Sequence, residues 1–165
     1  MKSIELTKVA IILAFGTVLQ TASICMLGLK PDIMLLTECF AIMIVPNKQN
    51  AFCVATVTGF ISALTTIAPY GQLPCILDKF VAAFIFFSLF SMTKNNKFLI
   101  FIKLFMTAMI SSTIFFSMII YFFGYMQNSI LISIFEAIIM SALVTSITGL
   151  ILMYVTSKYK GIQSI

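Results

Sequence analysis

Apolar runs long enough to cross a lipid bilayer as helices fill most of this chain. Of its 165 residues, 61% are hydrophobic and only 9% are charged, whereas about a quarter of the residues of a soluble domain are charged. The runs do not alternate apolar and polar residues as barrel strands do, so we expect helices. The sequence therefore predicts an all-α integral membrane protein with a single membrane-embedded domain over residues 1–165.

Short polar stretches divide the chain into six apolar runs. We expect membrane-spanning helices over residues 4–24, 31–45, 51–68, 77–92, 98–123 and 130–156. The second and fourth are short for a bilayer core about 30 Å thick, whereas the last two are long enough to tilt. The first run has the length of a full span and keeps polar residues late in it, so we interpret it as a retained helix.

The lysines favour one orientation in the membrane. One set of helix ends carries Lys2, Lys8, Lys48, Lys94, Lys97, Lys103, Lys158 and Lys160. Lys30 and Lys79 fall at the other set of ends. Because cytoplasmic loops are enriched in lysine and arginine, both termini are predicted to be cytoplasmic. The same rule accounts for the net charge of +5, so we expect no nucleic-acid partner.

A polar hairpin between the third and fourth runs is the most distinctive stretch of the sequence. The segment 69–74, PYGQLP, is followed shortly by the adjacent Asp78 and Lys79. Charges near hydrocarbon are costly and often mark a functional site. Capping of a helix by Asp78 and snorkelling of Lys79 to the headgroups would explain the pair equally well.

The predicted orientation gathers polar residues at the outer side of the membrane. They are Lys30, Asp32, Gln72, Asp78, Lys79, Tyr125, Gln127 and Asn128. Glu38 and Glu136 lie about two turns into their helices from that side, where an ionised acid needs a partner or a water-filled cavity. A structural ion pair would also explain either glutamate, and stabilisation of a first helical turn would explain Asp32.

Small residues recur at every fourth position on three of the expected helices. These stripes are Ala10 and Ala14 on the first, Ala55, Gly59 and Ala63 on the third, and Ala137, Ser141, Thr145 and Gly149 on the sixth. Small residues let helix backbones approach closely. We expect such stripes to pack inside the bundle or against a partner.

The sequence carries no signature of an enzyme, a nucleotide site or a metal site. It has no Walker A loop, no GxGxxG, GxSxG or HExxH motif, and no histidine. Its four cysteines lack CxxC spacing, so we interpret them as small apolar residues. We predict no catalytic residue, no bound metal and no cofactor.

Two segments resemble the TrpP family of tryptophan transporters, which belongs to the substrate-binding S components of energy-coupling factor (ECF) transporters. One is segment 30–36, KPDIMLL, and the other is segment 59–90 with its SALTT, GQLP and DK motifs. The spacing of Ala10 and Ala14 is similar to the AxxxA signature by which S components dock on their coupling subunit. The resemblance covers essentially the whole chain.

The resemblance implies a multi-pass protein of the bacterial cell membrane that binds tryptophan, or a related aromatic or vitamin-like solute, from outside. It would deliver the solute inward together with a transmembrane coupling subunit and two ATPase subunits, with Ala10 and Ala14 facing the partner. The residues expected to bind the substrate are Lys30, Asp32, Gln72, Asp78, Lys79 and Glu136, with aromatic walls from Tyr70, Phe84 and Tyr125. Two alternatives stay open, a gradient-driven transporter or exporter with Glu136 as its proton-coupling group, and a membrane adaptor without transport activity.

Overall fold

The computed structural model describes residues 3–22, 32–66, 71–92, 97–123 and 128–162. Within these ranges the chain forms six α-helices and no strand, which confirms the all-α prediction for the described part. The helices are α1 (Ser3–Ala22), α2 (Ile33–Ile44), α3 (Lys48–Thr65), α4 (Gln72–Met92), α5 (Lys97–Phe123) and α6 (Asn128–Ile162).

Four of the described helices are long and apolar enough to cross a membrane. These segments are Ile4–Thr21, Gln72–Met92, Phe98–Phe122 and Ile134–Leu152, in α1, α4, α5 and α6. In contrast, α2 is apolar but has only 12 residues, and α3 carries more polar side chains. These four segments indicate a multi-pass helical membrane protein. The count of six spans and the cytoplasmic position of both termini stay predictions.

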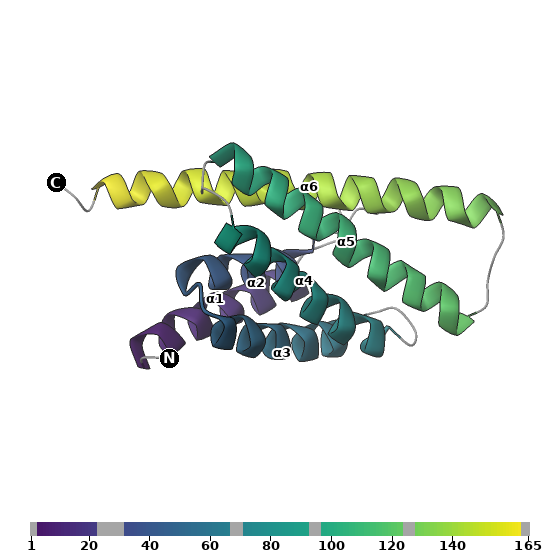
Figure 1. The fold of residues 1–165 in the computed structure, drawn as a ribbon, viewed down its shortest axis with the longest axis horizontal. Helices are drawn as coiled ribbons and strands as arrows, with labels where there is room; N and C mark the ends of the chain where they lie inside the picture. The colour runs from purple at the N-terminus through teal and green to yellow at the C-terminus, as the bar shows by residue number, and fades with distance from the viewer. Residues whose placement is uncertain (1–2, 23–31, 67–70, 93–96, 124–127, 163–165) are drawn as a thin grey trace.

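Successive helices run in alternating directions, and the start of α1 lies at the same end of the bundle as the end of α6 (Figure 1). In that view α6 lies along the top, α5 crosses it, and α1 to α4 form the lower part. The helix α3 packs along α4, α4 against α5, and α5 against α6. The short helix α2 contacts each of the other five helices, so it forms the centre of the bundle.

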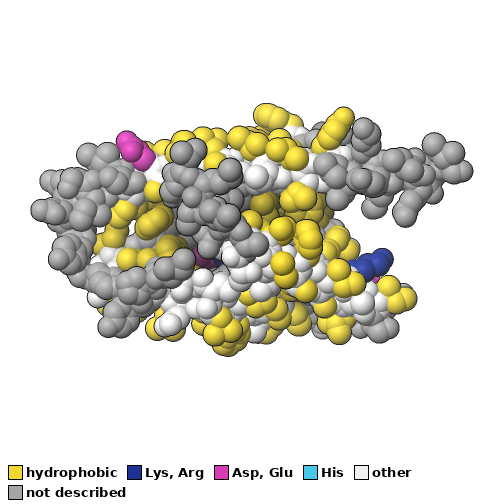
Figure 2. Space-filling model, turned by 180° about the vertical axis from the view of Figure 1, so that it is seen from behind, with side chains coloured by type: hydrophobic (Ala, Val, Ile, Leu, Met, Phe, Trp, Pro, Cys, Tyr) yellow, Lys and Arg dark blue, Asp and Glu magenta, His cyan; other side chains and the backbone are white. Residues whose placement is uncertain are grey.

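Buried apolar side chains of α2 to α6 form the main core. Its largest fully buried side chains include Phe86, Met34 and Leu35. Large hydrophobic side chains also cover the outside, as Figure 2 shows for one face. This distribution suits a chain whose outer surface faces lipid, because lipid tails are as apolar as the core.

Two of the glycines at close helix contacts lie on the small-residue stripes of α3 and α6. A Cβ added at Gly59 would lie 3.3 Å from the Cα of Ile76 on α4, and one added at Gly149 would lie 2.7 Å from Cδ1 of Leu104 on α5. Ala55 and Ala63 are buried beside Gly59. The small-residue stripe of α3 therefore packs inside the bundle, as does the part of the α6 stripe that ends at Gly149.

Two predicted helix boundaries are wrong. The fourth helix begins at Gln72 rather than residue 77, and the Cys75 N–H donates to the Gly71 carbonyl at 2.9 Å. Pro74 is compatible with this start, because an N–H in the first turn has no partner within the helix. The sixth helix extends to Ile162 rather than residue 156.

Candidate functional site

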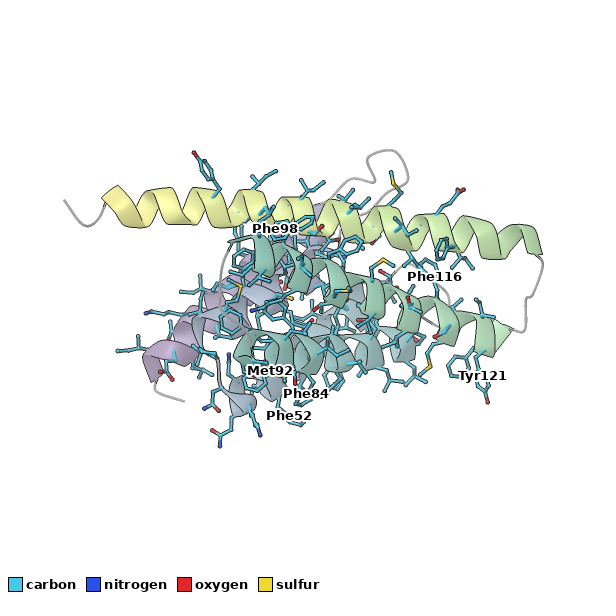
Figure 3. The ribbon with its side chains drawn as sticks, turned by 45° about the horizontal axis from the view of Figure 1, so that its top comes forward. Phe52, Phe84, Met92, Phe98, Phe116 and Tyr121 are labelled. Atoms are coloured by element: carbon cyan, nitrogen blue, oxygen red, sulfur yellow. The ribbon has the colours of Figure 1, made fainter. Side chains whose placement is uncertain are left out.

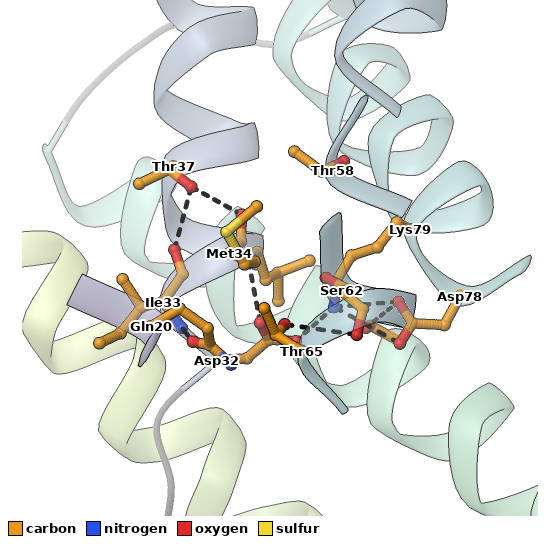
Figure 4. Close-up of polar contacts among 12 residues, drawn as sticks. Gln20, Asp32, Ile33, Met34, Thr37, Thr58, Ser62, Thr65, Asp78 and Lys79 are labelled. Carbon is orange, nitrogen blue, oxygen red and sulfur yellow. Dashed lines mark hydrogen bonds and ion pairs between the residues drawn. The ribbon is translucent and has the colours of Figure 1, made fainter. Parts of the chain in front are cut away.

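A buried group of charged side chains joins three helices. The Lys79 ammonium of α4 pairs with Oδ2 of Asp32, at the start of α2, and lies 3.1 Å from Oδ1 of its neighbour Asp78. The hydroxyl of Ser111, on α5, donates to Oδ1 of Asp78 at 3.0 Å. We call Asp32, Asp78, Lys79 and Ser111 the charged cluster; its first three members are labelled in Figure 4.

Helix geometry explains how Asp32 takes part in this cluster. Asp32 is the N-cap of α2, and its Oδ1 accepts a hydrogen bond from the backbone N–H of Leu35 at 3.0 Å. Satisfying a free N–H at a helix start is the usual role of an N-cap carboxylate. Because Oδ1 caps the helix, Oδ2 is directed to Lys79, so one side chain performs both functions.

Asp78 and Lys79 lie on the buried face of α4, next to Ala82, Ala83 and Phe86. Asp78 is the seventh residue of that helix, so it does not cap the N-terminus. The side chain of Lys79 is only 3% exposed, so it does not snorkel to a surface. Both simpler explanations of the pair are therefore excluded by the structure.

The exposure of the cluster is uneven. The side chains of Lys79 and Asp78 are 3% and 5% exposed, whereas that of Asp32 is 30% exposed. Asp32 therefore connects the buried charges with the surface of the bundle. In Figure 2, acidic and basic atoms are visible near the middle of the face shown, between hydrophobic and undescribed residues.

A further carboxylate, Glu38 of α2, is enclosed close to the cluster. Glu38 is fully buried, and within the described residues neither of its oxygens has a hydrogen-bond partner. It interacts electrostatically with Lys79, Asp78 and Asp32, and the Thr58 hydroxyl of α3 lies where it can hydrogen-bond to it. The Thr58 hydroxyl also donates to the carbonyl of Val54 at 2.8 Å, so Glu38 competes with that carbonyl for the single proton of Thr58.

The hydroxyl groups of α3 extend this polar region. Ser62 is 8% exposed, and its Oγ likewise has no hydrogen-bond partner among the described residues. Figure 4 shows Ser62 and Thr65 beside Asp32, Asp78 and Lys79. The site is therefore a polar interior formed by α2, α3, α4 and α5 within an apolar bundle.

The structure brings together only part of the predicted set of site residues. Asp32, Asp78 and Lys79 meet. Lys30, Tyr70 and Tyr125 lie outside the described residues.

Three other predicted residues are described, and they are not part of the cluster. Gln72 is exposed at the first position of α4, and Glu136 is exposed on α6. Phe84 is 43% exposed and lies with Phe52 on the outer side of the bundle (Figure 3). The candidate site residues of α4 therefore lie on different sides of the helix, with Asp78 and Lys79 inside the bundle and Phe84 outside.

Sequence reasoning missed Ser111. A signal for it exists in α5, where Lys103, Thr107 and Ser111 follow one another at every fourth position and are all buried. Residues spaced by four lie on one face of a helix. This spacing indicates a polar interior face on an otherwise apolar helix, but it does not identify Asp78 as the partner.

Comparisons with known proteins agree on one family. The sequence profile described as "Tryptophan transporter TrpP" matches residues 2–160. A "Probable tryptophan transport protein" of Bacillus subtilis (strain 168) is 44% identical over 98 residues, which is 59% of this chain and 57% of the relative. A protein of the same description from Clostridium perfringens (strain 13 / Type A) is 31% identical over 91 residues, 54% of this chain and 50% of the relative.

The matched segments span about half the length of these curated relatives. No solved structure matches the chain. The family profile, in contrast, covers nearly the whole sequence and includes every residue of the charged cluster. This chain belongs to the TrpP family of tryptophan transporters.

Proposed function

We propose that this protein is the substrate-binding S component of an ECF-type importer and that it binds tryptophan at the charged cluster. The observation that carries the proposal is the buried group of Asp32, Asp78 and Lys79 inside an apolar bundle of a TrpP family member. Ionisable groups within a membrane bundle are costly and mark substrate or ion sites. A zwitterionic amino acid requires polar partners of both charges, and this region contains both.

The proposed site includes the predicted residues that the structure leaves compatible with it. Asp32, Asp78 and Lys79 form its charged part, and Lys30, Tyr70 and Tyr125 stay predictions for its rim. The exposed position of Gln72 at the start of α4 also suits a rim. Phe84 is left out because it lies on the outer side of the bundle, and Glu136, which is exposed on α6, stays a prediction.

The first helix supports the proposed docking on a coupling subunit. Ala10 and Ala14 are exposed on α1, and the neighbouring Ile11 and Phe15 are 63% and 61% exposed. Small residues flanked by apolar side chains form a surface on which another membrane helix can pack closely. In this proposal ATP hydrolysis by the partner ATPases drives release of the substrate to the cytoplasm of a bacterial cell.

The gradient-driven alternative has less support. In that alternative the proton-coupling group is Glu136, which is exposed on α6. A proton-coupling carboxylate inside a membrane is expected to face the bundle interior or a water-filled cavity.

Ligand-induced thermal stabilisation of the purified protein tests the substrate. Tryptophan at a hundred times its dissociation constant should add about 2.7 kcal/mol to the free energy of unfolding, which corresponds to a rise in Tm of roughly 5 to 11 °C for a chain of this size. Lysine and glutamate should give no shift. A rise in Tm with another solute but not with tryptophan would refute the assignment of tryptophan as the substrate, but it would still be consistent with a transporter.

Uptake into proteoliposomes tests the mechanism. Transport should require the coupling subunit, the two ATPases and ATP. Uptake by this protein alone, driven by a pH gradient, would contradict the S-component assignment even where tryptophan binds.

A further inference from the structure

Three acidic side chains lie near Lys79. Among the described residues, Asp32, Asp78 and Glu38 all act electrostatically on this one ammonium. Lys79 contacts the first two directly, whereas no hydrogen bond of good geometry reaches the Glu38 oxygens from the described part of the chain. A buried carboxyl group carries a charge at little cost only when a cation pairs with it and donors hydrogen-bond to it, so Glu38 needs a further cation in order to be ionised here.

The unpartnered atoms near Glu38 indicate the chemistry of the missing group. They are its two carboxylate oxygens; Oγ of Ser62, one helical turn from Thr58 on α3, also lacks a partner among the described residues, and this hydroxyl can accept as well as donate. The Thr58 hydroxyl has a single proton, for which backbone carbonyls also compete, so it supplies at most one donor to Glu38. The two carboxylate oxygens of Glu38 fit a cation that carries several N–H donors, and an ammonium group has three donors and no acceptor.

We propose that Glu38 is a substrate-binding residue that receives the α-ammonium group of the amino acid. The inference rests on the proposed function, because it takes the transported solute to be an amino acid such as tryptophan. Within that function it distinguishes Glu38 from Asp32 and Asp78, whose carboxylates are already occupied by Lys79. A charge-assisted hydrogen bond between the two groups compensates Glu38 only when the substrate is present.

This assignment has a consequence for the protein without ligand. Replacing Glu38 with glutamine should not destabilise the empty protein, because the described part of the chain shows no ion pair of Glu38 that the amide would lose. If Glu38 instead served only to pair with Lys79, the same substitution would lower the ligand-free Tm. The ligand-free Tm therefore separates the two roles independently of any binding measurement.

The test uses three ligands on the full-length protein purified in detergent. Tryptophan has both charged groups, tryptamine lacks the carboxylate, and indole-3-propionate lacks the ammonium. Dissociation constants are measured for the wild type, for Glu38→Gln, and for Glu5→Gln, a matched control in which the same change is made in the first turn of α1.

Glu38→Gln should weaken the binding of tryptophan and tryptamine at least tenfold and should leave indole-3-propionate unchanged, while the ligand-free Tm does not fall. The control should bind all three ligands like the wild type. Equal losses for all three ligands, or no loss for tryptophan, would overturn the assignment of Glu38 and leave the proposed function in place.

Two further outcomes are decisive. If Glu38→Gln does not fold, the dissociation constants of the wild type still test the assignment. Binding of indole-3-propionate as tight as that of tryptophan would overturn an ammonium subsite. If the wild type binds neither tryptophan nor tryptamine, the proposed function itself fails, and the inference fails with it.

Discussion

Replacing Lys79 with methionine should be the most destabilising single substitution in the charged cluster. The ammonium is 3% exposed and contacts Asp32 and Asp78, so its loss leaves two carboxylates without their cation. Removing one partner of a buried ion pair costs about 3 to 5 kcal/mol. For a chain of this length the loss corresponds to a decrease in Tm of roughly 6 to 20 °C.

Asp78→Asn should cost less, about 1 to 3 kcal/mol, because Lys79 keeps Asp32 and the amide oxygen still accepts from Ser111. The double variant, Asp78→Asn with Lys79→Met, should be no less stable than Lys79→Met alone, since residues in one ion-pair network are not additive. The control is Lys48→Met at the exposed start of α3, with an expected change within about 0.5 kcal/mol.

Thermal unfolding of the four variants in detergent, followed by circular dichroism, measures these differences. The reasoning would be refuted if Lys79→Met were as stable as Lys48→Met, or if Asp78→Asn were the more damaging change. Additive effects in the double variant would show that the two side chains do not share one network.

Three further predictions concern other contacts. Gly59→Val should lower stability by about 1 to 3 kcal/mol through overpacking, because a Cβ at this position would already lie 3.3 Å from the backbone of α4; an unchanged Tm would argue against close α3–α4 packing. Ala10→Leu and Ala14→Leu should leave Tm and ligand binding intact while abolishing uptake in cells, since both residues are exposed, and lost binding by the isolated protein would indicate an internal role instead. Ser111→Ala should cost about 1.5 to 3 kcal/mol, because it removes a donor to the charged Asp78, and a thermal scan showing no change would contradict that hydrogen bond.

Apolar runs and turn residues were sufficient to predict the class of the protein. In lipid, backbone groups must be satisfied within the structure, so an apolar run of span length has few alternatives to a helix. That constraint acts locally, and this is why the six described helices lie close to the six predicted runs. The predicted start of the fourth helix was wrong because proline occurs both in loops and in the first turn of a helix. The sequence pattern places Pro74 in a loop, whereas in the structure it lies in the first turn of α4.

The partners within the site were decided by the tertiary structure. Helical periodicity shows which residues share a face of one helix, but it does not show which faces of different helices meet. Lys79 reaches Asp32 across 47 positions of sequence, and Ser111 reaches Asp78 across 33. The sequence alone did not distinguish Glu38 from Glu136, since both are acids about two turns into apolar helices. Because α2 contacts all five other helices, Glu38 is fully buried, whereas Glu136 on α6 remains exposed.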